Sequence, residues 1–555
     1  MTTTELSARL PSREKTSLTD TVFSTDHKTV GLLVLGTALV LFLVFGAIAL
    51  TMRADLATPD QSLLSTHLYN EFFTLHGSGM IYLVITPIAL GLGIYLVPLQ
   101  VGAPGLAFPR VAQFGYFVYV ISAVLMLSGF LVSGGAADTG WYSYLPLADS
   151  INSPGKGMDL WIAAVFLAGL AGLLWSVSVL WTALRMRVPR MSMLRMPIFT
   201  WSEVVTCMMG LAAFPSLIGA MALQTLGRVD PKYFTHDLPN LNYQNLFWFY
   251  GHPVVYIMFF PFVGCVAEVL QTFGGRRYVG YKFTVFSLLL FAALSMSVWG
   301  HHMFTTGQSS NEYFSATSTT LSVPAGIEYF GFLGTLIGAR IRFNTPMLFA
   351  LAFIPQFLIG GLSGIMLAAP TLDYDFHSTY FVVAHFHYTL FAGSVFGFFA
   401  GFYYWFPKAT GRMLSERLGK THFLLMLVGT NVTFLPMFFS GYFGMARRVA
   451  HYPGALHILN LIESCGAGVL GISMIVLVVN VGESLRNRRP APADPWSGLT
   501  LEWATTSPPP PFNFAGGVPP VKSFAPLLDL KLERERRLEE APTPAEGGGA
   551  EESGP

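Results

Sequence analysis

The stretch LFWFYGHPVVYIMFFP, residues 246–261, contains no charged residue and carries one histidine in its middle. It lies within a longer, mainly apolar run, 243–271. A run of about 20 apolar residues indicates a transmembrane helix, because lipid offers backbone groups no partner outside their own helix. The eleven further runs of this kind are approximately 29–52, 72–101, 111–135, 158–186, 197–226, 282–305, 315–340, 346–368, 379–405, 421–445 and 455–485. The sequence therefore predicts an all-α integral membrane protein with twelve transmembrane helices.

The composition agrees with a membrane protein and excludes several other classes. Of the 555 residues, 52% are hydrophobic and only 11% are charged, which is too little charge for the surface of a soluble protein of this size. The net charge of +1 gives no reason to expect a nucleic-acid partner. Cys207, Cys265 and Cys465 are far apart in the sequence, so neither a disulfide framework nor a thiolate metal site is expected.

The orientation follows from lysine and arginine in the short loops. Loops on the same side as the N-terminus carry fourteen of these residues against six on the opposite side. We therefore expect 1–28 to be a cytoplasmic N-terminal segment and 29–485 to be the twelve-helix domain. Residues 486–555 are expected to form a cytoplasmic, Pro-rich and partly disordered tail, which ends in PTPAEGGGAEESGP.

Six of the thirteen histidines lie in or at the ends of apolar helices, where polar groups are costly and usually functional. They are His76, His252, His301, His302, His385 and His387. Given the expected helix directions, all six fall in the outer third of the membrane. A single such histidine is more often a hydrogen-bonded core residue. Six at one depth favour a metal site, because neutral imidazole binds both heme iron and copper.

The spacing of these histidines divides them into groups. His385 and His387 point about 200° apart on a helix and therefore cannot bind one metal, but they can hold two hemes on opposite sides. His301 and His302, together with His252, could give three nitrogens to a copper ion. Tyr256 is four residues after His252 and lies on the same helix face, where it could donate a proton and an electron.

Four motifs occur in order along the chain: TLHG at 74–77, GHPVVY at 251–256, HHMF at 301–304 and HFHY at 385–388. With them, the chain resembles the heme–copper oxidase superfamily, and most closely subunit I of cytochrome c oxidases. The similarity runs from DHKTVGLLVLG at residue 26 to SPPPPFNF near residue 514. The resemblance implies the twelve-helix arrangement of that family and a terminal respiratory oxidase that reduces O2 to water, with possible proton pumping.

The resemblance also implies a role for each histidine. His76 and His387 would be the axial ligands of a low-spin heme, and His385 the protein ligand of a high-spin heme. His252, His301 and His302 would bind copper, with Tyr256 covalently joined to His252. The cofactors implied are two hemes, expected to be heme A, and one copper ion.

Further residues are assigned by the same resemblance. Arg447 and Arg448 would pair with heme propionates, which suits their bidentate chemistry. Arg53 and Trp141 would contact the hemes. His377 matches a magnesium ligand, but the carboxylate that usually follows it is Ser378 in this chain.

Proton delivery is where the chain departs from the family. The glutamate of the usual GHPEVY motif is Val254, the aspartate of GAPD is Gly105, and the lysine of VPTGIK is Glu328. Two other sets of residues could carry protons in their place. Tyr250 is half of a tyrosine–serine pair found in some relatives. Glu328, with Thr319, Thr320 and Ser322 close to it in sequence, could conduct protons to Tyr256, although it could instead pair with a basic residue of another subunit.

The expected partners follow from what the chain lacks. It has no cysteine pattern for a dinuclear copper centre, which the resemblance puts on a subunit II that receives electrons from cytochrome c or a similar donor. A subunit III-like chain, smaller membrane subunits and a bacterial inner membrane are also implied. The alternatives are a quinol oxidase, a nitric oxide reductase, whose members generally lack Tyr256, and a twelve-helix transporter with structural histidines.

Overall fold

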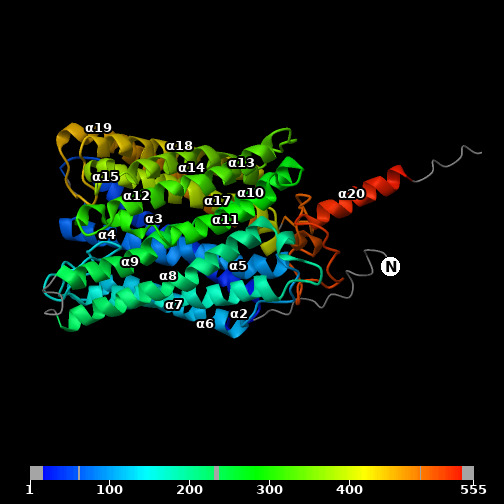
Figure 1. Cartoon of the computed structure of the whole chain (residues 1–555), viewed down its shortest axis with the longest axis horizontal. Coiled ribbons are helices and arrows are strands. Elements are labelled where there is room, and N and C mark those ends of the chain that lie inside the picture. Colours follow the sequence, from blue (N-terminus) through cyan, green and yellow to red (C-terminus); the bar gives the residue numbers. More distant parts are fainter. Residues whose placement is uncertain (1–16, 61–62, 231–236, 488, 541–555) are drawn as a thin grey trace, which may run out of the picture.

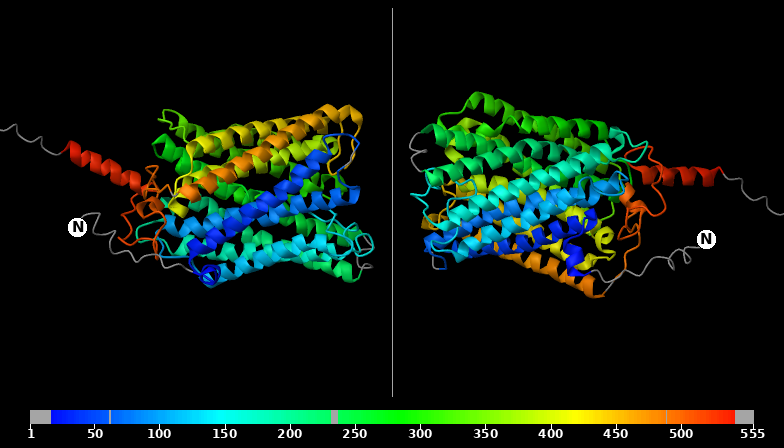
Figure 2. Two further views of the ribbon diagram at one scale, coloured as in Figure 1. Left: turned by 180° about the vertical axis from the view of Figure 1, so that it is seen from behind. Right: turned by 90° about the horizontal axis from the view of Figure 1, so that it is seen from below.

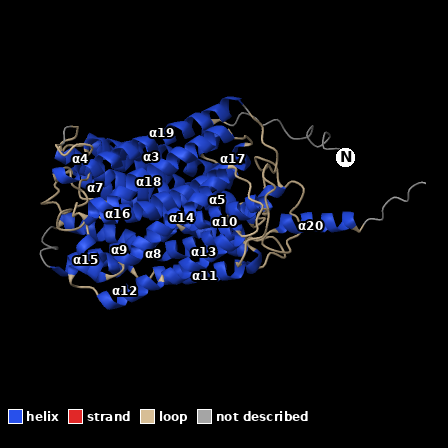
Figure 3. Cartoon of the chain, turned by 90° about the horizontal axis from the view of Figure 1, so that it is seen from above, coloured by secondary structure: helices blue, strands red, loops and turns tan. Residues whose placement is uncertain are grey.

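A computed structural model describes residues 17–60, 63–230, 237–487 and 489–540 of the chain. Long helices run side by side along the longest axis of the molecule, and loops gather at the two ends of the bundle (Figures 1 and 3). No strand occurs in the described part of the chain, which confirms the all-α prediction.

Eleven helical segments among the described residues are long and apolar enough to cross a membrane. They are His27–Asp55 (α3), Thr66–Gln100 (α4, η1 and α5), Pro109–Leu131 (α6 and η2), Lys156–Arg185 (α7), Ile198–Val229 (α8), Asn240–Gly274 (α9 and α10), Tyr281–Thr306 (α11 and η5), Thr345–Leu367 (α14), Tyr380–Thr410 (α16, η6 and α17), Glu416–Tyr442 (α18) and Gly454–Asn487 (η7 and α19). The eighth predicted span, 315–340, is two shorter helices, α12 (Asn311–Thr320) and α13 (Ser322–Leu336), which meet at Leu321. With this pair counted as one segment, the prediction of twelve spans is confirmed.

Interruptions of the regular helix lie next to predicted site residues. The π-helical segment η1 (Gly79–Ile85) begins three residues after His76, and η6 (His387–Val395) begins at His387 itself. Helix α9 (Asp237–Ile257), which carries His252, gives way to α10 (Phe260–Gly274) through a short turn. π-Helical turns inside longer helices are frequent at functional sites, because they shift the side-chain register of the residues that follow.

The two ends of the described chain lie at the same end of the bundle. Figure 1 shows α2 (Leu18–Val22) there, and the views of Figure 2 show α20 (Pro526–Glu539) extending from that end. An even number of membrane crossings requires this arrangement. The loops between α4 and α3, and the short helix α15 (Pro370–Phe376), lie at the opposite end.

The tail after α19 differs from the expectation of partial disorder. Residues 489–525 cover the end of the bundle, with Trp496, Leu501 and Trp503 buried in the same core as the transmembrane helices. The Lys408 ammonium donates to the carbonyls of Ala493 and Thr505, which further ties the tail to α17 (Phe396–Thr410). The proline-rich composition of the tail gave no indication that these apolar side chains would be buried. The terminal PTPAEGGGAEESGP segment and residues 1–16 lie outside the described residues.

Candidate metal centre

All six histidines of the sequence pattern line one cavity of about 1390 Å³ inside the bundle. Ordinary small-molecule sites have volumes of roughly 300–1,000 Å³. The walls are mostly aliphatic and aromatic, and they come from nearly all of the long helices. The cavity therefore has room for more than one large, flat, mainly apolar group.

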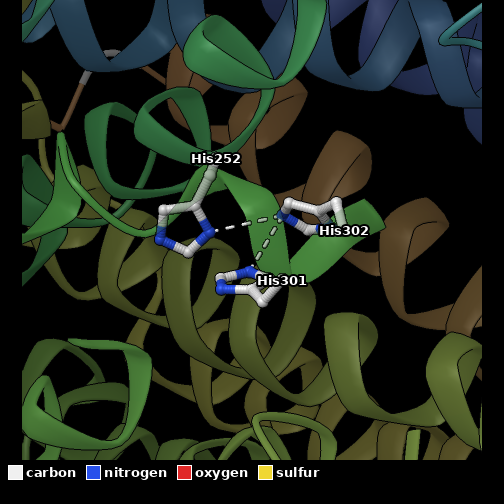
Figure 4. A group of neighbouring side chains, drawn as sticks. All are labelled: His252, His301 and His302. Atoms are coloured by element: carbon white, nitrogen blue, oxygen red, sulfur yellow. Dashed lines mark hydrogen bonds between the residues drawn. The ribbon is translucent and has the colours of Figure 1, made fainter. Parts of the chain in front are cut away.

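Three of the histidines form a compact cluster on two neighbouring elements. His252 comes from α9, while His301 and His302 come from the 3-10 segment η5 (Trp299–Thr306). One ring nitrogen from each lies within 4.8 Å of the other two, and Figure 4 shows the three rings facing one another. His302 Nε2 is 3.3 Å from His252 Nδ1 and 3.1 Å from His301 Nε2. Three converging imidazole nitrogens match the ligand preference of copper.

Hydrogen bonding fixes which nitrogen of His301 faces this cluster. The Ser318 hydroxyl donates to the Phe314 carbonyl, so its oxygen is left to accept from His301 Nδ1 at 2.7 Å. His301 Nε2 then keeps its lone pair for a metal. The Trp248 ring stacks on His302 with centroids 3.9 Å apart, which restrains the orientation of that ring.

Tyr256 lies beside the ring of His252. The two rings have centroids 4.6 Å apart, and Tyr256 packs on Phe291 of α11 (Tyr281–Ser295). His252 Nε2 is buried and has no hydrogen-bond partner among the described residues. His252 therefore presents Nδ1 to the cluster and keeps Nε2 uncommitted.

His385 is held by α14 (Thr345–Leu367). Its Nδ1 donates to the Gly360 carbonyl at 3.0 Å, so Nε2 keeps its lone pair. A Cβ atom at Gly364 would lie 2.9 Å from the His385 ring, and glycine at this position lets the helix approach so closely. His385 lies in α16 (Tyr380–Phe386), next to the start of η6.

His76 and His387 are oriented in the same manner. His76 Nδ1 donates to the Phe45 carbonyl at 3.0 Å, and His387 Nδ1 donates to the Val383 carbonyl at 2.8 Å. Each imidazole thus has one nitrogen committed to backbone and the other free. This outer-shell pattern is typical of histidines that bind metals.

Arg447 and Arg448 lie in the loop after α18 (Glu416–Tyr442) and line the same cavity. Burial lowers the pKa of Arg447, and it lowers the pKa of Arg448 to about 10. Neither guanidinium forms an ion pair with a carboxylate in the described ranges, and Arg447 Nε is buried without a partner. Two partly buried cations without a carboxylate partner in the described part of the chain suit an anionic group within the cavity.

Arg53 and Trp141 also line the cavity. Arg53 is paired with a residue that the sequence analysis did not single out. Its Nη2 lies 3.1 Å from Glu463 Oε2, and Glu463 is fully buried in α19 (His457–Asn487) and accepts from Ser440 at 2.6 Å. Trp141 accepts a hydrogen bond on its carbonyl from Tyr82.

His377 has a carboxylate partner despite Ser378 following it. Its Nδ1 donates to Asp373 Oδ2 at 3.0 Å, one helical turn earlier. The only group of three or more His, Cys, Asp or Glu donors within the described residues is the cluster of His252, His301 and His302. Asp373 could therefore serve as a second metal ligand beside His377. A magnesium ion bound there would need its remaining ligands from groups other than His, Cys, Asp or Glu side chains of the described residues.

The candidates for proton transfer do not all lie together. Glu328 is 2% exposed and faces the bundle, so the alternative of an ion pair with another subunit is not supported. Thr319 and Thr320 are exposed on the outside of α12, which places them off any internal route. Tyr250 is buried and stacks on Tyr82 with centroids 6.1 Å apart, away from the cavity lining.

Comparisons with known proteins agree with this geometry. The family model described as cytochrome C and quinol oxidase polypeptide I matches residues 29–469. The chain is 44% identical over 516 residues to the probable cytochrome c oxidase subunit 1-beta of Nocardia farcinica, covering 92% of this chain and 87% of the relative. It is 45% identical over 527 residues to cytochrome c oxidase subunit 1 of Corynebacterium diphtheriae, covering 93% of each.

A solved structure supports the fold independently. A heme-copper terminal oxidase dimer determined by cryo-EM superimposes with a TM-score of 0.65 at 18% sequence identity. The superposition covers 82% of this chain and 84% of that one. At such low identity this likeness concerns the fold alone.

Proposed function

The chain belongs to the family of cytochrome c and quinol oxidase polypeptide I, and on this premise we propose that its six cavity histidines hold two hemes and one copper ion. The chain is the catalytic subunit of a terminal oxidase, an oxidoreductase in the membrane. The observation that carries the proposal is the cluster of three ring nitrogens within 4.8 Å, from His252, His301 and His302.

The residues fit these cofactors by donor type and orientation. The three clustered nitrogens would hold the copper ion. His385, with Nδ1 on backbone, would hold the high-spin heme, while His76 and His387 would hold the low-spin heme from two sides. When bound, these groups supply electrons and the place where oxygen reacts.

The surrounding side chains orient the site and move protons. Tyr256 can donate its hydroxyl proton towards the copper cluster, and the unpartnered Nε2 of His252 beside it supports the covalent link that the family resemblance implies. Arg447 and Arg448 would bind the heme propionates. This tyrosine favours oxygen reduction over nitric oxide reduction, and consumption of nitric oxide in place of oxygen would contradict it.

Glu328 is the centre of the proposed proton route to Tyr256. Its Oε1 lies 3.5 Å from Ser287 Oγ, and because Ser287 donates to the Pro324 carbonyl, a protonated Glu328 can donate to Ser287. Ser287 lies one turn from Phe291, which contacts Tyr256. The acid and its serine therefore lie on the side of α11 that packs against the tyrosine, and a proton would pass Phe291 on water molecules.

The same route continues from Glu328 towards the end of the bundle that carries the tail. The Tyr278 and Thr284 hydroxyls are buried, have no partner among the described residues and meet at Gly331, one turn from Glu328. Tyr278, Thr284 and Ser287, rather than Thr319 and Thr320, therefore supply the hydroxyl groups of the proposed route. Together they form a line of polar groups on which a proton can move.

Replacement of Glu328 tests this route. We expect Glu328→Gln to lower the rate of oxygen consumption by about 10-fold or more, since general acid–base groups commonly contribute at least this much. Thr320→Val, on the exposed face of α12, is the matched control and should leave the rate unchanged. A wild-type rate in Glu328→Gln would remove Glu328 from the route.

The relatives support a proposal for the electron donor and for the assembly. We propose that cytochrome c or a similar protein gives electrons to a subunit II with a dinuclear copper centre, and that a subunit III-like chain, smaller membrane subunits and heme A complete the enzyme of a bacterial inner membrane. Purified enzyme should consume oxygen with reduced cytochrome c. Oxygen consumption with quinol alone would instead support the quinol oxidase reading.

A further inference from the structure

Glu203 is a second buried acid, in a different part of the bundle from Glu328. It lies in α8 (Ile198–Val229), is 0% exposed, and neither carboxyl oxygen has a hydrogen-bond partner in the described part of the chain. Its carboxyl group lies against α5 (Thr86–Gln100), where a Cβ atom at Gly93 would be 2.6 Å from Oε2. Glycine at position 93 therefore leaves the space that this acid occupies.

An ionised carboxylate without a partner is costly in a membrane interior, whereas a valine or leucine at the same place would be favourable. Thr206 lies three residues further along the same helix face, and its buried hydroxyl also has no partner among the residues that the structure describes. Two such neighbouring groups suit a bridging water molecule. The pair has the chemistry of a site that takes up and releases protons.

A chain of hydrogen bonds reaches the first turn of α8 from the tail. Thr200 donates to Gln100 at 2.8 Å, and Gln100 donates to Glu502 at 3.1 Å. Glu502 belongs to η8 (Leu501–Ala504), is fully buried, and has one oxygen without a partner within the described residues. Burial raises the pKa of Glu502 above its ordinary value, which favours the protonated form of this carboxyl.

Glu268 completes the cluster on the side of α10. It accepts from the Phe199 amide at 3.4 Å and from Gln271, whose own Oε1 is buried and has no partner among the described residues. Helices α8 and α10 are in close contact there, since a Cβ atom at Gly264 would lie 2.7 Å from Phe199 Cα. Glu268 thus contacts α8 at Phe199, one turn before Glu203.

We propose that Glu203 carries protons during turnover, taken up from the tail-covered end of the bundle through Glu502 and Glu268 and passed on by way of Thr206. The inference rests on the proposed oxidase function and adds a route separate from that of Glu328, which lies on α13. In each transfer the carboxyl group of Glu203 gives up its proton on the side of Thr206 and regains one from the side of Glu268.

The test uses the assembled enzyme, with its hemes and copper, in sealed vesicles. We expect Glu203→Gln to lower the oxygen consumption rate by about 10-fold or more and to remove a protonated-carboxyl band from the infrared difference spectrum between reduced and oxidised enzyme. Glu203→Asp should restore much of the rate, because it keeps an acid. Ser202→Ala, a buried neighbour on α8 whose hydroxyl bonds only to its own helix, is the control and should behave like wild type.

Two results would overturn the inference: a wild-type rate and proton-to-electron ratio in Glu203→Gln, or a loss that Glu203→Asp does not restore. Should Glu203→Gln fail to assemble, Thr206→Val tests the same route, and an unchanged rate in that variant counts against it. Failure of the proposed function appears differently, as a wild-type enzyme that lacks heme and copper or consumes no oxygen.

Discussion

At the residue scale, the copper cluster depends on a hydroxyl group seventeen residues from the histidine it orients. Ser318 accepts from His301 Nδ1 at 2.7 Å and thereby directs Nε2 to the cluster. We expect Ser318→Ala to lower copper affinity by about 10–100-fold, the usual effect of losing an outer-shell partner. Copper content per heme measures this, with Thr320→Ala on the same helix as control. Full copper occupancy in Ser318→Ala would contradict this role.

The Glu463 carboxylate neutralises the positive charge of Arg53. The two form a buried ion pair of 3.1 Å at the wall of the cavity, so Arg53 acts as part of a neutral pair. In Glu463→Gln the uncompensated cation should raise the midpoint potential of the low-spin heme by tens of millivolts, because a unit charge over ~10 Å at an effective dielectric constant of ~20 contributes ~1.7 kcal/mol. A redox titration followed by the heme spectrum measures the shift. Ser464→Ala, which removes two hydrogen bonds with Arg53 but no charge, should leave the potential close to wild type. An equal shift in both variants would argue against a charge effect.

The sequence predicted the six histidines because each is a polar residue in an apolar helix, visible without knowledge of the fold. It could not predict that Ser318 orients His301 or that Glu463 pairs with Arg53, since these contacts depend on how the helices pack. Thr319 and Thr320 are close to Glu328 in sequence, yet both side chains are exposed on the outside of the helix. Ser287, on another helix, lies beside the acid instead.

At the element scale, hydropathy located the helices but not the places where they break. A count of apolar residues cannot detect the division of the eighth span at Leu321. Nor can it detect the π-helical segments next to His76 and His387. The tail shows the reverse problem. Its proline content suggested disorder, whereas a few large apolar side chains, above all Trp503, anchor it to the bundle.

Trp503 provides a test of that anchoring. It is 3% exposed, and the Lys408 ammonium lies 5.0 Å from its ring centroid. Trp503→Ala should destabilise the protein by about 3–5 kcal/mol, the usual cost of removing a large core aromatic, and lower the thermal midpoint. Phe512→Ala, at a side chain 79% exposed, should leave the midpoint unchanged. Equal midpoints for Trp503→Ala and wild type would show that the tail is not held in this way.

At the scale of the whole molecule, loop charge and architecture give the same topology. The basic loops predicted that both ends of the chain share the cytoplasmic side, and α2 and α20 do lie at one end of the bundle (Figure 1). In inside-out vesicles, trypsin should therefore cut at the exposed Arg536 and Arg537 of α20. In right-side-out vesicles the same sites should be protected, and cleavage there would reverse the proposed orientation.

The convergence of six imidazoles from separate helices on one cavity is the basis of the whole account. Iron and copper content of the purified enzyme, measured together with its reduced spectrum, tests it most directly. We expect two heme irons for the one copper ion that this chain binds, beside the two copper ions of the proposed subunit II, and loss of that one copper ion with retention of the low-spin heme bands in His302→Ala. Purified protein that contains neither metal, or a His302→Ala variant that keeps its copper, would contradict it.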